Sequence, residues 1–527
     1  MKDDTHVSTA RVHARNITAN WIAQVANILL MLFLSPFIVH TLGKVQYGVW
    51  CLLTVFTGYM GLLDLGIRAG TGRFVMVYLA KGDHKRVNDT LRTSLGFFSA
   101  ISVLVFAAAV GVGWLFPSFF ASVPAKHHGT IQVLLILVAI QIWLTACRTA
   151  ISSVLAAHER FDLARGGDLL NLAVRAVLTV WLLSAGYGLV GLMISVLAQA
   201  VLGTGVTYLL AKRVYPQLRV WPLALKRARL RELFGFGIAA FAATMAARLT
   251  VQTNQLIIGA AVSVAEVTTY AVGTMLTFHF SNFVLQIARS LFPAVQRAAT
   301  QGKTGEVRWL LLRQVRLALL IGILGYVGFV VLGEGFIRLW MLGPKFPEAS
   351  VVRATEVMRL MAASNAALLL MTGAPELLTA VGRIRSYAAI SVFAAVLSVT
   401  MVLVFLLVFG WGVAGAALAL LISRALVRVP VTTWYACHTV GINWASFMLR
   451  ALGRAAVACG LFAASLALVQ HLVPATSWGA FVLQGVLALV AYVPIGLLVL
   501  VPPADRKRIW QRLGWRVRAI DIDREGG

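Results

Sequence analysis

The sequence is poor in charged residues, and above all in acidic ones. Of its 527 residues only 12% are charged, with 19 Asp and Glu in total, whereas 60% are apolar and the mean hydropathy is +0.85. A soluble domain is typically about a quarter charged and about half apolar. This composition excludes a soluble enzyme, a disordered chain and a disulfide-stapled secreted scaffold. It indicates a membrane protein, whose length cannot be used to count soluble domains.

Cysteine is scarce as well. The four cysteines all lie in apolar runs and form no CxxC pair, so they indicate neither a disulfide framework nor a metal site. The sequence also lacks the G-x4-GK-[ST] motif, which argues against ATP hydrolysis by this chain. We therefore expect no metal and no cofactor. No small-residue cleavage site follows the first apolar run, which predicts a retained helix rather than a signal peptide.

Basic residues are in excess. The chain has 46 Lys and Arg, which gives a formal net charge of +27. In a soluble protein this excess would suggest nucleic-acid binding, but in a membrane protein basic residues gather on the cytoplasmic side. The distribution of Lys and Arg among the loops follows this second pattern, and we expect no nucleic-acid partner.

Long apolar runs make up most of the chain. A spanning helix needs roughly 20 mostly apolar residues, because the hydrocarbon layer is about 30 Å thick and a helix rises about 1.5 Å per residue. The predicted spans are roughly 17–40, 45–67, 91–116, 130–155, 166–185, 188–211, 233–259, 268–294, 307–332, 353–379, 386–409, 412–436, 449–471 and 478–501. The predicted fold class is therefore an all-α polytopic membrane protein with about 14 transmembrane helices.

The basic residues predict the orientation. With the N-terminus inside, the cytoplasmic segments hold 31 of the 46 Lys and Arg residues, and the outside loops hold five. This asymmetry predicts that the N- and C-termini are both cytoplasmic. The same alternation supports the number of spans, because one missed helix would disrupt it.

The two halves of the chain resemble each other at an offset of about 220–224 residues. Tyr47–Val49 corresponds to Tyr270–Val272, and Tyr187–Gly191 corresponds to Trp411–Gly415. A repeat of six helices plus six predicts two lobes related by pseudo-twofold symmetry about the membrane normal, with a cavity between them. The predicted division is an N-lobe at 1–211, a basic cytoplasmic linker at 212–232, a C-lobe at 233–436, two additional C-terminal helices at 437–501 and a basic cytoplasmic tail at 502–527.

Polar side chains share one face in several predicted spans. Spacings of four and three residues place Asn20, Gln24 and Asn27 on one side of the first span, and the repeat offset aligns Gln24 with Arg248. Polar residues inside a membrane tend to face a partner or water. Hydrogen bonding between packed helices, worth about 0.6 kcal/mol per contact, is the alternative. The amide side chains predicted to contact substrate are Asn20, Gln24, Asn27, Asn282 and Gln286.

Four arginines lie ten or more residues inside predicted spans: Arg148, Arg175, Arg248 and Arg424. Each would cost about 2.5–3.5 kcal/mol if it faced lipid. The spans offer few acids to pair with them, namely Asp64, Asp168 and Glu376. Arginines without carboxylates imply a water-filled, positively charged lumen, and the guanidinium fork fits phosphate oxygens. We therefore predict that these four arginines bind an anionic group of the substrate.

Asp64, Arg68 and Arg289 are predicted as gate or coupling residues near the cytoplasmic ends of the second and eighth spans. Asp64 and Arg68 are four residues apart, so a plain ion pair along one helix is the alternative for them. Snorkelling of the long side chain to the lipid headgroups is the alternative for Arg289.

Two short motifs near the N-terminus resemble a known family. The Leu42-Gly43-x3-Tyr47-Gly48 and Leu63-Asp64-Leu65-Gly66 motifs are similar to the opening of bacterial polysaccharide-biosynthesis flippases, the O-antigen and exopolysaccharide exporters of the multidrug/oligosaccharidyl-lipid/polysaccharide (MOP) superfamily. The resemblance implies a polyprenyl-diphosphate-linked oligosaccharide as substrate, carried from the cytoplasmic to the periplasmic leaflet of the bacterial inner membrane by alternating access. It implies membrane lipids and the polysaccharide polymerase machinery as partners, and no catalytic residue.

Two other functions stay open at this stage. A cation-coupled drug or metabolite exporter of the same superfamily would prefer cationic cargo, which a positive lumen repels. Related drug exporters often carry an acidic residue in the first span, and here that span has none. A membrane glycan polymerase or ligase would need a sizeable periplasmic loop with catalytic groups, and the longest outside break, about 333–352, offers little.

Overall fold

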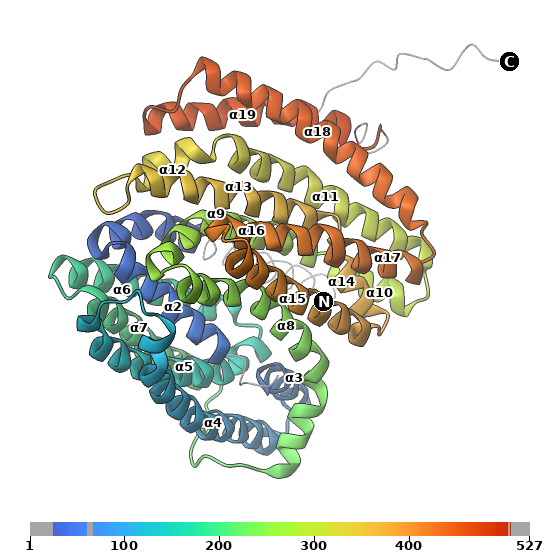
Figure 1. The fold of residues 1–527 in the computed structure, drawn as a ribbon. Coiled ribbons are helices and arrows are strands. Elements are labelled where there is room, and N and C mark those ends of the chain that lie inside the picture. The colour runs from blue at the N-terminus through green and yellow to red at the C-terminus, as the bar shows by residue number, and fades with distance from the viewer. Residues whose placement is uncertain (1–24, 61–66, 504–505, 507–527) are drawn as a thin grey trace. The chain divides into compact units, whose positions relative to one another are not determined.

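The computed structural model describes residues 25–60, 67–503 and 506 (Figure 1). Within these residues the chain forms helices and no β-strand, apart from one isolated β-bridge between Gly343 and Phe346. The α-helices are Val25–Leu42, α2 (Lys44–Met60), α3 (Ile67–Ala80), α4 (His84–Phe119), α5 (His128–Ala157), α6 (Phe161–Ser184), α7 (Gly188–Val214), α8 (Arg227–Ala261), α9 (Val264–Arg289), α10 (Phe292–Thr300), α11 (Thr304–Val331), α12 (Gly333–Met341), α13 (Glu348–Leu369), α14 (Ala374–Ala380), α15 (Ile384–Leu403), α16 (Gly412–Ile422), α17 (Val429–Thr439), α18 (Trp444–Leu472) and α19 (Trp478–Val499). Two π-helical segments, Val404–Val408 and Ser423–Arg428, follow α15 and α16.

The all-α polytopic fold class is confirmed. Eleven helices in the described residues are long and apolar enough to cross a membrane. The other three predicted spans fall on α2, α8 and α9, which are helical too, although each predicted span includes residues or side chains that the structure does not describe. The chain is therefore a multi-pass membrane protein.

The helices group into two compact units by their contacts. Unit 1 takes the described residues up to Val272 together with Met341–Ala354 and Ile384–Leu420. Unit 2 takes Gly273–Trp340, Thr355–Arg383 and the described residues from Leu421 onward. The division into two six-helix lobes with two added helices stays a prediction.

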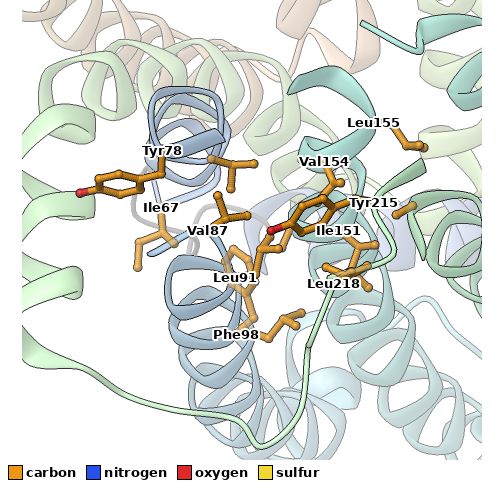
Figure 2. Close-up of a cluster of buried hydrophobic side chains, with 14 of the residues drawn as sticks. Ile67, Tyr78, Val87, Leu91, Phe98, Ile151, Val154, Leu155, Tyr215 and Leu218 are labelled. Atoms are coloured by element: carbon orange, nitrogen blue, oxygen red, sulfur yellow. The ribbon is translucent and has the colours of Figure 1, made fainter. Parts of the chain in front are cut away.

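A buried apolar cluster joins α3, α4 and α5 in unit 1 (Figure 2). Val87, Leu91 and Phe98 of α4 pack with Ile151 and Val154 of α5. Their spacings of four, seven and three residues place them on one face of each helix. This packing sets the separation of α4 and α5, which both line a cavity in unit 1.

The short helix α3 also joins this cluster. The composition of segment 72–90 is typical of an interfacial helix, which predicts that the apolar side chains of α3 face lipid headgroups. Instead, Val75 and Tyr78 are buried in the protein, while Met76 and Val77 are exposed. The expectation is wrong for Val75 and Tyr78, because composition does not show which apolar side chains meet a neighbouring helix.

The basic linker before α8 is held against the beginning of α4. Arg92 Nη2 donates to the Trp221 carbonyl oxygen at 2.7 Å, and Lys226 Nζ lies 2.6 Å from the Asp89 carboxylate. Gly96 allows this close approach, since a Cβ there would lie 2.5 Å from the Ala224 carbonyl oxygen. Part of the basic linker is therefore a packed segment of unit 1.

The beginning of α2 meets the beginning of α9 backbone to backbone. A Cβ on Gly48 would lie 2.0 Å from the Val264 carbonyl oxygen, so only glycine fits at this position without a shift. Thr268 Oγ1 adds a hydrogen bond to the Lys44 carbonyl oxygen at 2.6 Å. This contact explains physically why a glycine follows the tyrosine in the Tyr47-Gly48 motif.

In unit 2, α11 packs through its glycines. A Cβ on Gly322 would lie 2.4 Å from Leu369 of α13, and the Phe280 ring of α9 lies against Gly325. The C-terminal pair α18 and α19 joins α11 through Tyr492, whose hydroxyl donates to the Leu320 carbonyl oxygen at 2.5 Å. The two last helices are thus packed onto the rest of unit 2.

Candidate functional site

Unit 1 contains a cavity of about 300 Å³ between five helices. We call it the main cavity. Its lining residues come from α2, α3, α4, α5 and α8: Thr54, Thr57, Gly58, Arg68, Phe98, Ile101, Ser102, Val105, Gln141, Ile142, Trp143, Thr145, Ala146 and Arg248. None of these fourteen residues is acidic.

Arg248 of α8 reaches the main cavity beside α2. Its side chain is exposed, and Nη1 donates to the Gly58 carbonyl oxygen at 3.3 Å. One turn further along α8, the Gln252 amide occupies the space that a side chain on Gly58 would need, since a Cβ there would lie 1.9 Å from Gln252 Nε2. Gly58 therefore lets the polar face of α8 pack directly on α2 and orients the guanidinium at the cavity.

The neutral polar groups of the main cavity are suited to bind hydroxyl groups. The Thr54 and Thr57 hydroxyls donate to carbonyl oxygens one turn earlier in α2, at 2.7 and 3.2 Å, so their oxygen lone pairs can still accept. Gln141 Nε2 donates to Thr145 Oγ1 at 3.2 Å. Trp143 Nε1 donates to Ser99 Oγ at 3.1 Å, which anchors its ring at the cavity.

A second cavity of about 350 Å³ lies along the next turns of α5, and Thr145 lines both cavities. Here Arg148 of α5 and Arg165 of α6 share the Asp168 carboxylate, and Arg148 Nε also donates to Thr207 Oγ1 at 3.2 Å. The expectation that the intramembrane arginines lack carboxylate partners is therefore wrong for Arg148. Two guanidiniums on one carboxylate leave this cluster with one excess positive charge.

Arg175 and Arg424 are placed differently from Arg248. Arg175 is half-buried in α6 within the electrostatic reach of Tyr47, and its buried Nε finds no hydrogen-bond partner among the described residues. Arg424, in a π-helical segment of unit 2, is 6% exposed, and its Nη1 donates to Asn365 Oδ1 at 2.6 Å and to Ser364 Oγ at 3.2 Å. A role in substrate binding stays a prediction for both arginines.

The other predicted site residues are only partly described. Asn20, Gln24, Asp64 and the Arg289 side chain lie outside the described residues, so the Asp64–Arg68 ion pair stays a prediction. Asn27 is half-buried in unit 1. In unit 2, Asn282 is half-buried and Gln286 is exposed. Arg68, predicted as a gate residue, lines the main cavity together with Arg248.

Sequence reasoning missed most neutral groups of the main cavity. Gln141 and Thr145 lie four residues apart in one predicted span, and this spacing could have marked a polar face on α5. Thr54, Thr57 and Ser102 carry no comparable signal, because threonine and serine in a spanning helix commonly bond to their own backbone.

A family profile described as "Polysaccharide biosynthesis protein" matches residues 39–351. No curated protein matches the chain at the level of sequence. The motifs around Gly43, Gly48 and Gly66 lie within the matched range.

Solved structures of MOP-superfamily proteins share the fold. An inward-facing multidrug resistance MATE family transporter aligns with a TM-score of 0.68 and 13% identity, over 78% of this chain and 94% of that chain. The lipid II flippase MurJ in an inward closed conformation aligns with a TM-score of 0.68 and 12% identity, over 94% of this chain and 99% of that one. A MOP-superfamily transporter from Pyrococcus furiosus aligns with a TM-score of 0.60 and 13% identity, over 81% and 93%. The MOP-type fold is therefore established.

Proposed function

The chain belongs to the polysaccharide biosynthesis protein family, and from that premise we propose that it is a flippase for a polyprenyl-diphosphate-linked oligosaccharide, an O-antigen or exopolysaccharide repeat unit. The main cavity carries the proposal. Arg68 and Arg248 line it among hydroxyl and amide groups, and none of its fourteen described lining residues carries a carboxylate. This combination suits a diphosphate joined to a sugar, because guanidinium groups bind phosphate oxygens and neutral polar groups bind sugar hydroxyls.

The roles of the residues follow from their positions. Arg248, oriented by the Gly58 carbonyl, holds the diphosphate. Thr54 and Thr57 accept hydrogen bonds from sugar hydroxyls, and Gln141 offers an amide. Arg148 extends the anion-binding surface along α5, where its cluster retains one positive charge. Seven further residues predicted to contact the substrate are not among the described lining residues of either cavity of unit 1: Asn20, Gln24, Asn27, Arg175, Asn282, Gln286 and Arg424.

Transport on this scheme makes and breaks no covalent bond. The headgroup enters from the cytoplasmic leaflet, the two lobes alternate in exposing it, and the polyprenyl tail stays in the bilayer. The protein then acts in the bacterial inner membrane with both termini in the cytoplasm. Its partners are the lipid-linked oligosaccharide, the surrounding lipids and the polysaccharide polymerase machinery that receives the flipped unit.

The same fold also occurs in MATE family transporters, so a cation-coupled drug or metabolite exporter is the alternative. The lining of the main cavity argues against it, because its fourteen described residues include two arginines and offer no carboxylate to bind a cationic cargo. A membrane glycan polymerase or ligase receives no support from the groups described at either cavity.

Deletion of the gene in its bacterial host tests the proposal. We expect a polyprenyl-diphosphate oligosaccharide to accumulate on the cytoplasmic leaflet and surface polysaccharide to be lost. A plasmid copy of the natural chain should restore export, and a copy with Arg248→Ala should fail although it inserts into the membrane at the same level. Arg213→Ala is the matched control, since Arg213 is an exposed arginine at the end of α7 and lines neither cavity.

Two results would reject the proposal. If lipid-linked intermediates do not accumulate in the deletion strain while resistance to cationic drugs falls, the chain is an exporter of the alternative class. If Arg248→Ala restores export as well as Arg213→Ala does, the main cavity is not the diphosphate site.

A further inference from the structure

Unit 2 contains a separate cavity of about 190 Å³ between α11 and α18, and Leu500, the residue after α19, also lines it. Its twelve lining residues combine three arginines with apolar side chains: Leu312, Val315, Arg316, Leu319, Ile442, Asn443, Ser446, Phe447, Arg450, Ala451, Arg454 and Leu500. None of these twelve residues is acidic.

Each helix contributes both kinds of side chain. On α18, Ser446, Arg450 and Arg454 recur every four residues and therefore share one face, with Phe447 and Ala451 beside them. On α11, Arg316 lies among apolar residues at helical spacing. The cavity therefore places a cluster of positive charge next to an apolar surface. This combination suits an amphipathic anion.

The depth of the cavity in the membrane follows from the helix ends that form it. Its residues come from the middle turns of α11, from the first turns of α18 and from Leu500 at the end of α19. The distribution of Lys and Arg predicts that these ends are cytoplasmic. Nearby on α18, Leu449 is 76% exposed, as expected for a side chain that acyl chains cover. Anionic phospholipids are enriched in the cytoplasmic leaflet and bind basic pockets between membrane helices.

We propose that this cavity binds an anionic phospholipid of the cytoplasmic leaflet. Arg450 and Arg454 hold the phosphate with Arg316 opposite them, and the acyl chains begin along Phe447 and Ala451. Asn443 caps α18 by accepting from the Ser446 N–H at 3.0 Å, and its side-chain NH₂ group can donate to the headgroup. The site lies in a different unit from Arg248 and needs no assumption about the transported cargo.

Native mass spectrometry of the purified full chain tests the site with phosphatidylglycerol and phosphatidylcholine as probes. We expect phosphatidylglycerol to bind more tightly than phosphatidylcholine. Each arginine near the membrane surface contributes roughly fivefold to the affinity for an anionic lipid, so Arg450→Gln with Arg454→Gln should reduce the preference about 25-fold. The matched control is Arg297→Gln with Arg385→Gln, which removes the same charge from two exposed positions outside this cavity. An equal loss in both double variants would overturn the proposal, because it would show attraction by net charge alone.

A second variant separates a lipid from a free phosphate ion and guards against misfolding of the first. Ala451→Trp fills the apolar part of the cavity and changes no charge. We expect it to weaken phosphatidylglycerol binding while inorganic phosphate binds both chains equally weakly. If inorganic phosphate competes with phosphatidylglycerol at equal concentration, or if Ala451→Trp binds the lipid like the natural chain, the lipid assignment is wrong.

Discussion

The cluster of Arg148, Arg165 and Asp168 allows a quantitative test of how unit 1 tolerates positive charge. Asp168→Asn keeps the size of the side chain and removes the carboxylate that both guanidiniums contact. The two arginines would then face each other without a counter-charge beside the second cavity. We expect the variant to fold less stably and to remain an all-helical membrane protein.

The magnitude follows from the exposure of the three side chains. Arg148, Asp168 and Arg165 are 25%, 35% and 42% exposed. Exposed ion pairs contribute about 0.2–1 kcal/mol, and removing one partner of a fully buried pair costs about 3–5 kcal/mol. For this intermediate exposure, and with screening by water, we expect a loss of about 1–2 kcal/mol.

A double-mutant cycle measures this coupling directly. The variants are Asp168→Asn, Arg148→Gln and the double variant, compared by thermal unfolding of the purified protein in one detergent. Arg148→Gln should partly relieve Asp168→Asn, because it removes one of the two uncompensated charges. Asp162→Asn is the control on the same helix, since it removes a carboxylate that pairs with Arg160, two residues earlier in the chain. The reasoning is refuted if Asp168→Asn unfolds at the same temperature as Asp162→Asn, or if the double variant loses the sum of the two single losses.

Three further outcomes are expected. Gly48→Ala should destabilise unit 1 by about 1–3 kcal/mol, because the added Cβ would overlap the Val264 carbonyl oxygen. A variant that unfolds at the same temperature as the natural chain would contradict this. Arg248→Lys should restore only part of the export lost in Arg248→Ala, since a point charge lacks the bidentate fork; full rescue would show that charge alone suffices. Burial raises the pKa of Glu232, but hydrogen bonds from Tyr78 and Arg229 outweigh it and hold that pKa below its ordinary value of 4.5. The ionised Glu232 carboxylate therefore stabilises the fold fully above about pH 4.5, and this stabilisation is lost as the pH falls. Glu232→Gln should make the free energy of unfolding depend less on pH in the acid range. The same acid dependence in the variant and the natural chain would count against this.

Hydropathy and charge are local properties, and what depends on them could be predicted. Each apolar run longer than the hydrocarbon layer becomes a helix because the bilayer leaves no other partner for its backbone N–H and C=O groups. Arg248 was singled out because a guanidinium deep in a span must meet water or a partner, and it lines the main cavity.

Only the tertiary structure decided which polar residues share a cavity. In a membrane the lipid-facing and the packed sides of a helix are both apolar, so the sequence of α5 does not show that Gln141 faces Thr57 and Arg248. Asp168 reaches Arg148 because α6 returns beside α5, and Arg424 is buried because Asn365 packs against it. Pairing between separate helices depends on how they are placed against one another, and hydropathy along a single helix carries no record of that placement.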